Sequence, residues 1–299
     1  MSATRAGFVA ILGVPNAGKS TLVNQLVGSK ISIVTPKVQT TRSRVRGIVI
    51  AGETQLVLVD TPGIFAAKRK LERAMVEAAW SAASDADAVV LVADARHGLD
   101  EGTEAIISGL ERAGAEPALA LNKVDLMQRD RLLPVARAFS DRMSFLRTFM
   151  VSAATGDGVE DLKSWLAARM PEGPWLYPED QVADLPLRQL ASEITREQLF
   201  LKLHEELPYS LTVETELWQE RKDGSVRIEQ VIFVERESQR KIILGRQGQQ
   251  IKAIGQAARI GIAEAIGQPV HLFLFVKVRE KWTEDSERLR MMGLEPPRK

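Results

Sequence analysis

The stretch Gly13-Val-Pro-Asn-Ala-Gly-Lys-Ser20, followed by Thr21, decides the fold of this chain. It matches the pattern G-x-x-x-x-G-K-[ST] of a phosphate-binding loop. Residues 8–12 before it form a short apolar run, which predicts a buried parallel strand. Residues 21–27 after it predict the first turns of a helix. A strand, a glycine loop and a helix in this order are the context that the motif requires.

The residue types in this loop suit a bound nucleotide. Glycines let the backbone wrap a phosphate, so that several N–H groups point at it, and the helix N-terminus adds its positive end. Lys19 supplies a positive charge for the β- and γ-phosphates, and the Ser20 hydroxyl is placed to ligate Mg²⁺. The residues predicted to bind nucleotide here are Gly13, Asn16, Ala17, Gly18, Lys19, Ser20 and Thr21.

Composition narrows the class of protein. With 299 residues the chain is long enough for two domains, and 45% hydrophobic with 26% charged residues is ordinary for a globular protein. Its apolar runs are too short for a transmembrane helix, and the N-terminus has no apolar signal-peptide segment. The absence of cysteine excludes disulfides and fits a cytoplasmic protein. A net charge of +1 means that any nucleic-acid surface must be local.

The first half of the chain alternates strands and helices, which predicts a mostly parallel sheet covered on both faces. We expect strands at residues 45–51, 55–60, 87–94, 118–121 and 148–151. We expect helices at residues 71–82, 101–113, 129–139 and 159–170. Ligands bind at the carboxyl ends of the strands in such sheets.

Two further motifs follow strands of this predicted sheet. In Asp60-Thr-Pro-Gly63, we expect Asp60 to hold Mg²⁺ through a water and the Gly63 N–H to reach a γ-phosphate. In Asn122-Lys-Val-Asp125, the Asp125 carboxylate can accept hydrogen bonds from the N1–H and 2-amino groups of guanine. Adenine lacks both donors, so this side chain selects guanine.

The rest of the base site lies nearby in the sequence. Asn122 is expected to tie its loop to the phosphate-binding loop, while the Lys123 stem lies over the base. After the last strand, the backbone of Ser152-Ala153-Ala154 is expected to meet the guanine oxygen.

In this order and spacing, the motifs resemble the GTP-binding domain of the small GTPases related to translation factors, over about residues 5–170. The resemblance implies GTP and GDP binding, Mg²⁺, slow hydrolysis and two mobile switch segments, at about residues 33–46 and 60–70. Gln39-Thr-Thr-Arg-Ser43 matches the second family motif, and we assign the GTP-dependent Mg²⁺ ligand to Thr41 over Thr40. Together with Lys19 and Gly63, Thr41 completes the expected catalytic set.

Two residues depart from the better-known members of this class. Ile64 stands where Ras-like enzymes place a water-orienting Gln, so the attacking water must be positioned by another group. In some relatives, an Asn at the position of Asn16 ligates K⁺, which implies stimulation by K⁺; the alternative is that Asn16 only braces the loop. The basic residues of the first switch have two readings, RNA contact in the GTP state or a solvated loop: Lys37, Arg42, Arg44 and Arg46.

We divide the chain into residues 1–170, a linker at 171–186 and a second domain at 187–299. The linker is rich in proline and aromatic residues, and Trp175 and Tyr177 are expected to anchor it to a domain face. In the second domain the pattern predicts a helix at 187–207, strands at 211–220 and 226–235, a short edge strand at 240–244, a helix at 249–266 and a strand at 270–277. We expect a further helix in the charged tail after Trp282.

Gly245-Arg-Gln-Gly248, with its flanking apolar residues, matches the GXXG signature of a KH domain, and the element order is that of type II KH domains. Residues 238–263 contain five basic and no acidic residues, the electrostatic footprint of a groove for single-stranded RNA. Under the bases we expect an apolar floor of Ile243, Leu244, Ile251 and Ile254, although these isoleucines also suit a core. The predicted RNA contacts are Arg240, Lys241, Gly245, Arg246, Gln247, Gly248 and Lys252.

A GTPase domain followed by a type II KH domain resembles the Era-type GTPases of bacterial small-subunit ribosome assembly over nearly the whole chain. This resemblance implies binding near the 3′ end of 16S rRNA, a role in maturation of the 30S subunit precursor, and peripheral contact with the inner face of the membrane. We expect a cytoplasmic monomer. The alternative function is an RNA-binding protein whose nucleotide is structural. An enzyme with another small-molecule substrate lacks support, since we find no additional His, Asp and Glu constellation in the sequence.

Overall fold

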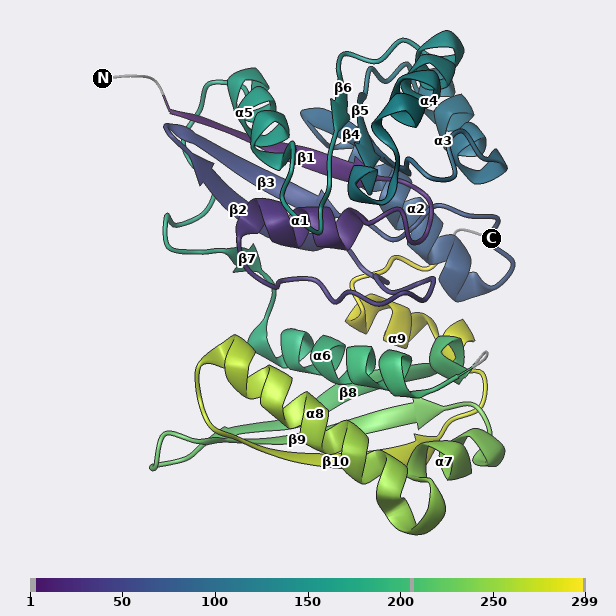
Figure 1. Cartoon of the computed structure of the whole chain (residues 1–299). Coiled ribbons are helices and arrows are strands. Elements are labelled where there is room, and N and C mark those ends of the chain that lie inside the picture. Colours follow the sequence, from purple (N-terminus) through teal and green to yellow (C-terminus); the bar gives the residue numbers. More distant parts are fainter. Residues whose placement is uncertain (1–3, 205–206, 298–299) are drawn as a thin grey trace. The chain divides into compact units, whose positions relative to one another are not determined.

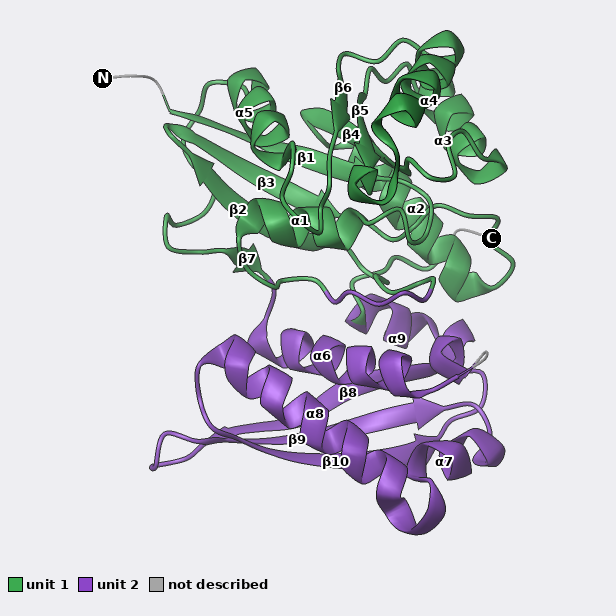
Figure 2. Cartoon of the chain, in the orientation of Figure 1, with its two compact units in different colours: residues 1–32, 38–184, 292–299 green, residues 33–37, 185–291 purple. Residues whose placement is uncertain are grey.

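The computed structural model describes residues 4–204 and 207–297, which form two compact units (Figure 2). Of these residues, 4–32, 38–184 and 292–297 belong to the first unit. The second unit contains 185–204 and 207–291, and it also takes in the short segment 33–37. Part of the predicted first switch therefore groups with the second unit.

The first unit is built on a seven-stranded sheet in the order β6-β5-β4-β1-β3-β2-β7 (Figure 1). All pairs from β6 to β3 are parallel, whereas β2 and β7 are antiparallel to their neighbours. The strands are β1 (Arg5–Leu12), β2 (Val45–Ala51), β3 (Thr54–Asp60), β4 (Ala88–Asp94), β5 (Ala118–Asn122), β6 (Thr148–Met150) and β7 (Ala183–Asp184).

Five α-helices in the described part of the first unit bury the apolar side chains of this sheet. The helices are α1 (Lys19–Val27), α2 (Lys70–Ser84), α3 (Glu101–Arg112), α4 (Arg129–Arg142) and α5 (Val159–Arg169). Buried residues of α2, α3 and α4 share one hydrophobic core with alternate residues of β1, β4 and β5. Helices α1 and α5 pack against each other and against β3. The predicted mostly parallel α/β fold and its element types are confirmed.

The predicted linker begins by packing on the first unit. Trp175 Nε1 donates to the Glu53 carbonyl at 3.1 Å, and the Tyr177 hydroxyl donates to Asp184 Oδ2 at 3.0 Å. Gln55, which is fully buried in β3, donates its Nε2 to the Tyr177 carbonyl at 2.8 Å. Both aromatic residues therefore anchor this segment, as predicted.

The second unit carries helices on a three-stranded sheet of order β10-β9-β8. Strands β8 and β9 are antiparallel, whereas β9 and β10 are parallel. Helices α6 and α8 pack against each other and on the sheet (Figure 1). The elements are α6 (Leu187–Lys202), β8 (Leu211–Glu220), β9 (Val226–Val234), α7 (Glu237–Leu244), α8 (Gln249–Ile266), β10 (Val270–Val278) and α9 (Ser286–Met291). The tail helix α9 contacts the same sheet, with the Arg288 guanidinium 3.9 Å from the centre of the Phe233 ring of β9.

One predicted element is wrong. Residues 240–244 are not an edge strand but the second half of the helix α7. The helix begins with a side-chain cap, because Gln239 Oε1 accepts the backbone N–H groups of Glu235 and Arg236 at 2.9 and 3.0 Å. Ile243 points into the core and is the only buried residue of the run 240–244, while Ile242 is 56% exposed.

None of the helices in the described ranges has both the length and the apolar character needed to cross a bilayer.

Candidate functional site

Two glycines of the phosphate-binding loop occupy positions that have no room for a side chain. Gly13 has φ +155°, and a Cβ there would lie 2.3 Å from the Val92 carbonyl oxygen. At Gly18, with φ +95°, a Cβ would lie 2.2 Å from Asn122 Nδ2. The loop therefore passes close to β4 and β5, and at these two positions no side chain stands between its backbone and a phosphate.

Lys19 begins helix α1 and lies inside the loop. Its Nζ donates to the carbonyls of Gly13 and Val14 at 3.1 and 2.9 Å. Burial lowers the pKa of Lys19 to about 8, and the nearby Asp60 carboxylate only partly offsets this. Because phosphate oxygens would favour the ammonium form, bound nucleotide should restore the ordinary charge of this lysine.

The lowered pKa of Lys19 leads us to expect that nucleotide binding depends on pH. Its pKa is lower in the folded protein than in the unfolded chain, so between about pH 8 and 10.5 the unfolded chain binds more protons and stability rises with pH. In the same range nucleotide binding must take up a proton. Calorimetry of GDP binding at pH 8.5, in two buffers with different heats of ionisation, should show a binding heat that differs between the buffers. In Lys19→Arg this difference should disappear, because arginine stays protonated. An equal heat in both buffers for the unmodified protein would contradict the prediction.

Three predicted Mg²⁺ ligands converge beside this lysine. Ser20 Oγ lies 2.8 Å from Thr41 Oγ1 and donates to Asp60 Oδ2 at 2.7 Å. Thr41 Oγ1 also donates to the same carboxylate oxygen at 3.2 Å. Asp60 is fully buried, and burial raises its pKa despite the hydrogen bonds from Ser20 and Thr41. Two hydroxyls and a carboxylate are the hard oxygen donors that Mg²⁺ prefers, so the residues present fit this ion.

The arrangement favours Thr41 as the switch ligand. We expect Thr41→Ala to lower Mg²⁺-dependent GTP hydrolysis roughly 10-fold or more, since it removes one oxygen donor for the metal. Because this ligand is expected only in the GTP state, GDP affinity should change little. Thr40→Ala is the matched control, and its hydrolysis rate should stay near that of the unmodified protein. If Thr40→Ala were the damaging change, the assignment would be reversed.

Gly63 lies directly against the phosphate-binding loop. A Cβ at Gly63 would be 2.8 Å from the backbone nitrogen of Pro15, so only glycine fits this approach. The next residue, Ile64, donates its N–H to the Gly13 carbonyl at 3.2 Å and packs its side chain in the hydrophobic core. These contacts support a role for the Gly63 backbone at the γ-phosphate and a packing role for Ile64.

The base-recognition motif is tied to the phosphate-binding loop, as the sequence suggested. Asn122 Nδ2 donates to the Ala17 carbonyl at 2.9 Å, while its Oδ1 accepts the N–H of Ala153 at 2.9 Å. Lys123 donates its Nζ to the Asn16 carbonyl at 2.6 Å. Asp125 follows in a short 3₁₀ turn, Val124–Leu126, with its side chain exposed.

The loop at residues 152–154 joins the same cluster. Ser152 is fully buried, and its Oγ accepts the Thr155 N–H at 3.2 Å. Ala153 is held by its bond to Asn122, and Ala154 is exposed. Sequence reasoning missed one neighbour of this cluster, Asp94, although an acidic residue at the end of an apolar strand was a usable signal.

The basic residues of the first switch contact the protein itself. Arg46 bonds to Asp184 at 2.9 Å, and Arg44 lies 3.9 Å from Asp85. Arg42 is 3% exposed, and Lys37 donates to the Leu203 carbonyl. Arg42 is therefore not part of a solvated loop, while the Arg44 and Arg46 side chains keep 30% and 44% of their surface exposed, and the RNA contact in the GTP state stays a prediction for them.

In the second unit, the loop between α7 and α8 depends on its glycines. Gly245 has φ +72° and ψ 178°, a conformation essentially confined to glycine, and Gly248 has φ +75°. The side chains of Lys241, Arg246, Gln247 and Lys252 are exposed around it. Exposed cations beside a glycine backbone suit contact with the phosphates of a nucleic acid.

The structure narrows the other predicted RNA contacts. Arg240 pairs with Glu237 at 2.9 Å, which weakens the local positive charge. Ile243 and Ile254 are fully buried in the core of the unit, so they do not line a surface groove. Leu244 and Ile251 are partly exposed and remain the available part of the predicted apolar floor.

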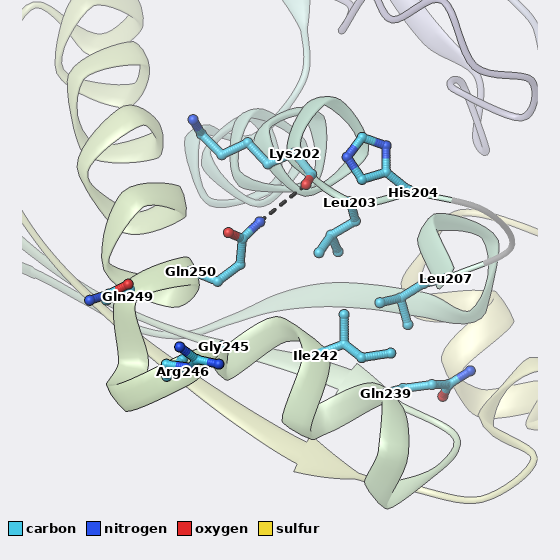
Figure 3. A pocket seen from close by; sticks show the side chains of 10 residues that line it. All are labelled: Lys202, Leu203, His204, Leu207, Gln239, Ile242, Gly245, Arg246, Gln249 and Gln250. Carbon is cyan, nitrogen blue, oxygen red and sulfur yellow. Dashed lines mark hydrogen bonds between the residues drawn. The ribbon is translucent and has the colours of Figure 1, made fainter.

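A hollow of about 580 Å³ lies beside the GXXG loop, lined by the last residue of α6 and residues after it, by α7, by the loop itself and by the first turn of α8. Figure 3 shows Leu203, Leu207 and Ile242 pointing into this space. Gln250, directly after the loop, donates its Nε2 to the Lys202 carbonyl at 3.1 Å. This bond fixes the start of α8 to the end of α6.

Comparison with known proteins identifies a separate family for each of the two units. A family model described as a 50S ribosome-binding GTPase matches residues 8–123, and a KH-domain model matches residues 206–283. The chain thus combines a P-loop GTPase domain with a KH domain. It is 62% identical over 295 residues to the GTPase Era of Afipia carboxidovorans, covering 99% of this chain and 96% of that relative. It is 60% identical to the GTPase Era of Bradyrhizobium diazoefficiens, with the same coverage. The chain belongs to the Era family of GTPases.

Solved structures of Era match this chain over nearly its whole length. A crystal structure of Aquifex aeolicus Era bound to GDP and AlF₄⁻ superposes with a TM-score of 0.93 at 36% identity, covering 97% of this chain and 99% of that one. A structure of Era with MgGDPNP and nucleotides 1506–1542 of 16S ribosomal RNA matches with the same TM-score, identity and coverage.

Proposed function

We propose that this GTPase is a nucleotide-controlled switch on RNA. The first unit binds and hydrolyses GTP with Mg²⁺, and the second unit binds the single-stranded 3′ region of 16S rRNA during assembly of the 30S subunit. The convergence of Ser20, Thr41 and Asp60 in a chain that also carries a GXXG loop supports this proposal most directly. The solved complex of the relative Era with 16S rRNA supports the choice of RNA.

Ordering of the first switch by Thr41 and Mg²⁺ supplies the coupling in this proposal. Residues 33–37 begin only a few positions before Thr41 and group with the second unit. There the Val34 N–H donates to Glu197 Oε1 of α6 at 3.0 Å, and Lys37 donates to the Leu203 carbonyl. A nucleotide that reorders the first switch would therefore act on groups bonded to α6. By linkage, RNA must then tighten GTP relative to GDP by the same factor.

The test is the affinity of the full chain for a short RNA matching the 3′ end of 16S rRNA, at one salt concentration. We expect binding about 5- to 150-fold tighter with a non-hydrolysable GTP analogue than with GDP, the range of typical couplings. Equal, tight binding in both states would favour the alternative function, an RNA-binding protein with a structural nucleotide. No binding in either state would remove the RNA assignment.

A potassium ion is part of the proposed GTPase mechanism. Asn16 is exposed in the phosphate-binding loop with φ +64°, where its side chain is accessible for an ion beside the phosphates. We expect hydrolysis to be faster in KCl than in NaCl of equal ionic strength by more than about 10-fold, less than the roughly 10³-fold or more of an arginine finger. Asn16→Ala should make the two rates equal. Equal rates in the unmodified protein would leave Asn16 as a brace for the loop.

The 30S precursor as partner, a cytoplasmic location, a monomeric state and peripheral contact with the inner membrane face belong to this proposal on the strength of the family resemblance alone.

A further inference from the structure

A buried carboxylate lies beside the base-recognition motif. Asp94 is the last residue of β4, and its side chain is only 4% exposed. The parallel pairing of β4 with β5 places Asp94 opposite Asn122, and the Ala95 N–H donates to the Asn122 carbonyl at 2.9 Å. The fold thus brings an acidic side chain to the start of the predicted base-binding loop.

Cations surround this carboxylate. The Asp94 Oδ2 atom accepts from Lys123 Nζ at 2.8 Å and from Arg96 Nη2 at 2.6 Å. The Oδ1 atom accepts from Arg96 Nε at 2.9 Å and from the backbone N–H of Arg96 at 3.1 Å. His97 Nδ1 stands farther away, at 3.7 Å from Oδ2. Burial alone would raise the pKa of Asp94, but the hydrogen bonds from Arg96 and Lys123 hold it well below its usual range. The group is therefore ionised at neutral pH and can anchor a cation.

The anchored cation bridges two loops. Lys123 has φ +65°, and its Nζ is shared between the Asp94 carboxylate and the Asn16 carbonyl of the phosphate-binding loop. With both ends of its side chain fixed, the four-carbon stem has little rotational freedom left to lose. Without the carboxylate, only the Asn16 carbonyl would hold the ammonium, and the stem would have to be ordered by the nucleotide itself.

We propose that Asp94 is a positioning residue for purine binding, which holds the Lys123 side chain extended and ready to lie against the base. The inference rests on the proposed role of Lys123 at the base. Because the stem covers a purine ring whatever its 2-substituent, Asp94 acts on the affinity for purine nucleotides in general. The choice of guanine is left to Asp125, which reads the 2-amino group.

The test compares GDP with IDP, whose base lacks the 2-amino group. Asp94→Asn keeps the shape of the side chain but removes its charge, and we expect both nucleotides to dissociate roughly 10-fold faster, the size of one charge-assisted hydrogen bond. The ratio of GDP to IDP affinity should stay unchanged. Unchanged dissociation of both nucleotides, or a loss confined to GDP, would overturn the proposal.

Three further variants separate positioning from a general loss of structure. In a Lys123→Ala background, Asp94→Asn should add nothing; the same 10-fold effect there would show that Asp94 acts through the fold. Arg96→Ala removes two side-chain hydrogen bonds to Asp94 but not the bond from Lys123, so GDP dissociation should become faster by less than the roughly 10-fold expected for Asp94→Asn. Asp100→Ala removes the cap of α3, where Asp100 Oδ1 accepts the Thr103 N–H at 2.7 Å, and should lower the melting temperature without faster dissociation. If the unmodified protein bound IDP as tightly as GDP, the base-site assignment itself would fail, which is a separate outcome.

Discussion

Replacing Asp125 by asparagine is expected to change the base that this GTPase binds. The Asp125 carboxylate is exposed in its 3₁₀ turn and is proposed to accept two hydrogen bonds from guanine. Each charge-assisted bond contributes about 1.5–3 kcal/mol, so their loss should lower GTP affinity by roughly 10²- to 10⁴-fold. An amide offers one acceptor and one donor, which match the N1–H and the 2-carbonyl of xanthine, so affinity for XTP should rise.

The experiment is a competition between GTP and XTP for the Mg²⁺-loaded protein, with hydrolysis of each nucleotide as a second readout. Asp130→Asn is the matched control, since it makes the same change of charge at an exposed position in the first turn of α4. That control should retain the preference for GTP. An Asp125→Asn protein that still prefers GTP to XTP would show that another group reads the base.

The first unit could be predicted well because its motifs and its sheet depend on local patterns. An apolar run, a glycine loop and a helix are contiguous in the sequence, and parallel strands gather their carboxyl ends at one edge. The contacts of Asn122 with Ala17 follow from that topology. The position of Asp94 depends on which strands pair and in what register, and the sequence does not state this.

The errors in the second unit have a similar physical origin. A short apolar run fits either a strand or a helix, so residues 240–244 gave no decisive periodicity. Their helical state depends on the cap made by Gln239 and on burial of Ile243 in the core. The grouping of residues 33–37 with the second unit likewise rests on contacts with α6, more than 150 positions away in the sequence.

Replacing Gly245 by alanine is expected to weaken RNA binding while leaving GTP hydrolysis without RNA unchanged. Gly245 has φ +72° and ψ 178°, and a Cβ there would lie 2.5 Å from Gln250 Cβ and 2.9 Å from its backbone nitrogen. The loop must therefore shift, and the strain of about 1–3 kcal/mol should appear as a roughly 5- to 150-fold loss of RNA affinity where the shifted backbone no longer fits the phosphates.

Gly267 provides a matched control at the other end of the same helix. It has φ +68°, caps the C-terminus of α8, and has nothing within 4 Å of the position of a Cβ. Gly267→Ala should therefore lower the stability of the protein by about 1 kcal/mol, because alanine is strained in the left-handed conformation, and it should not displace the loop. RNA affinity measured at fixed salt should fall for Gly245→Ala alone. If both variants lost the same affinity, the effect would come from a less stable α8, and the GXXG loop would not be the surface that meets the RNA backbone.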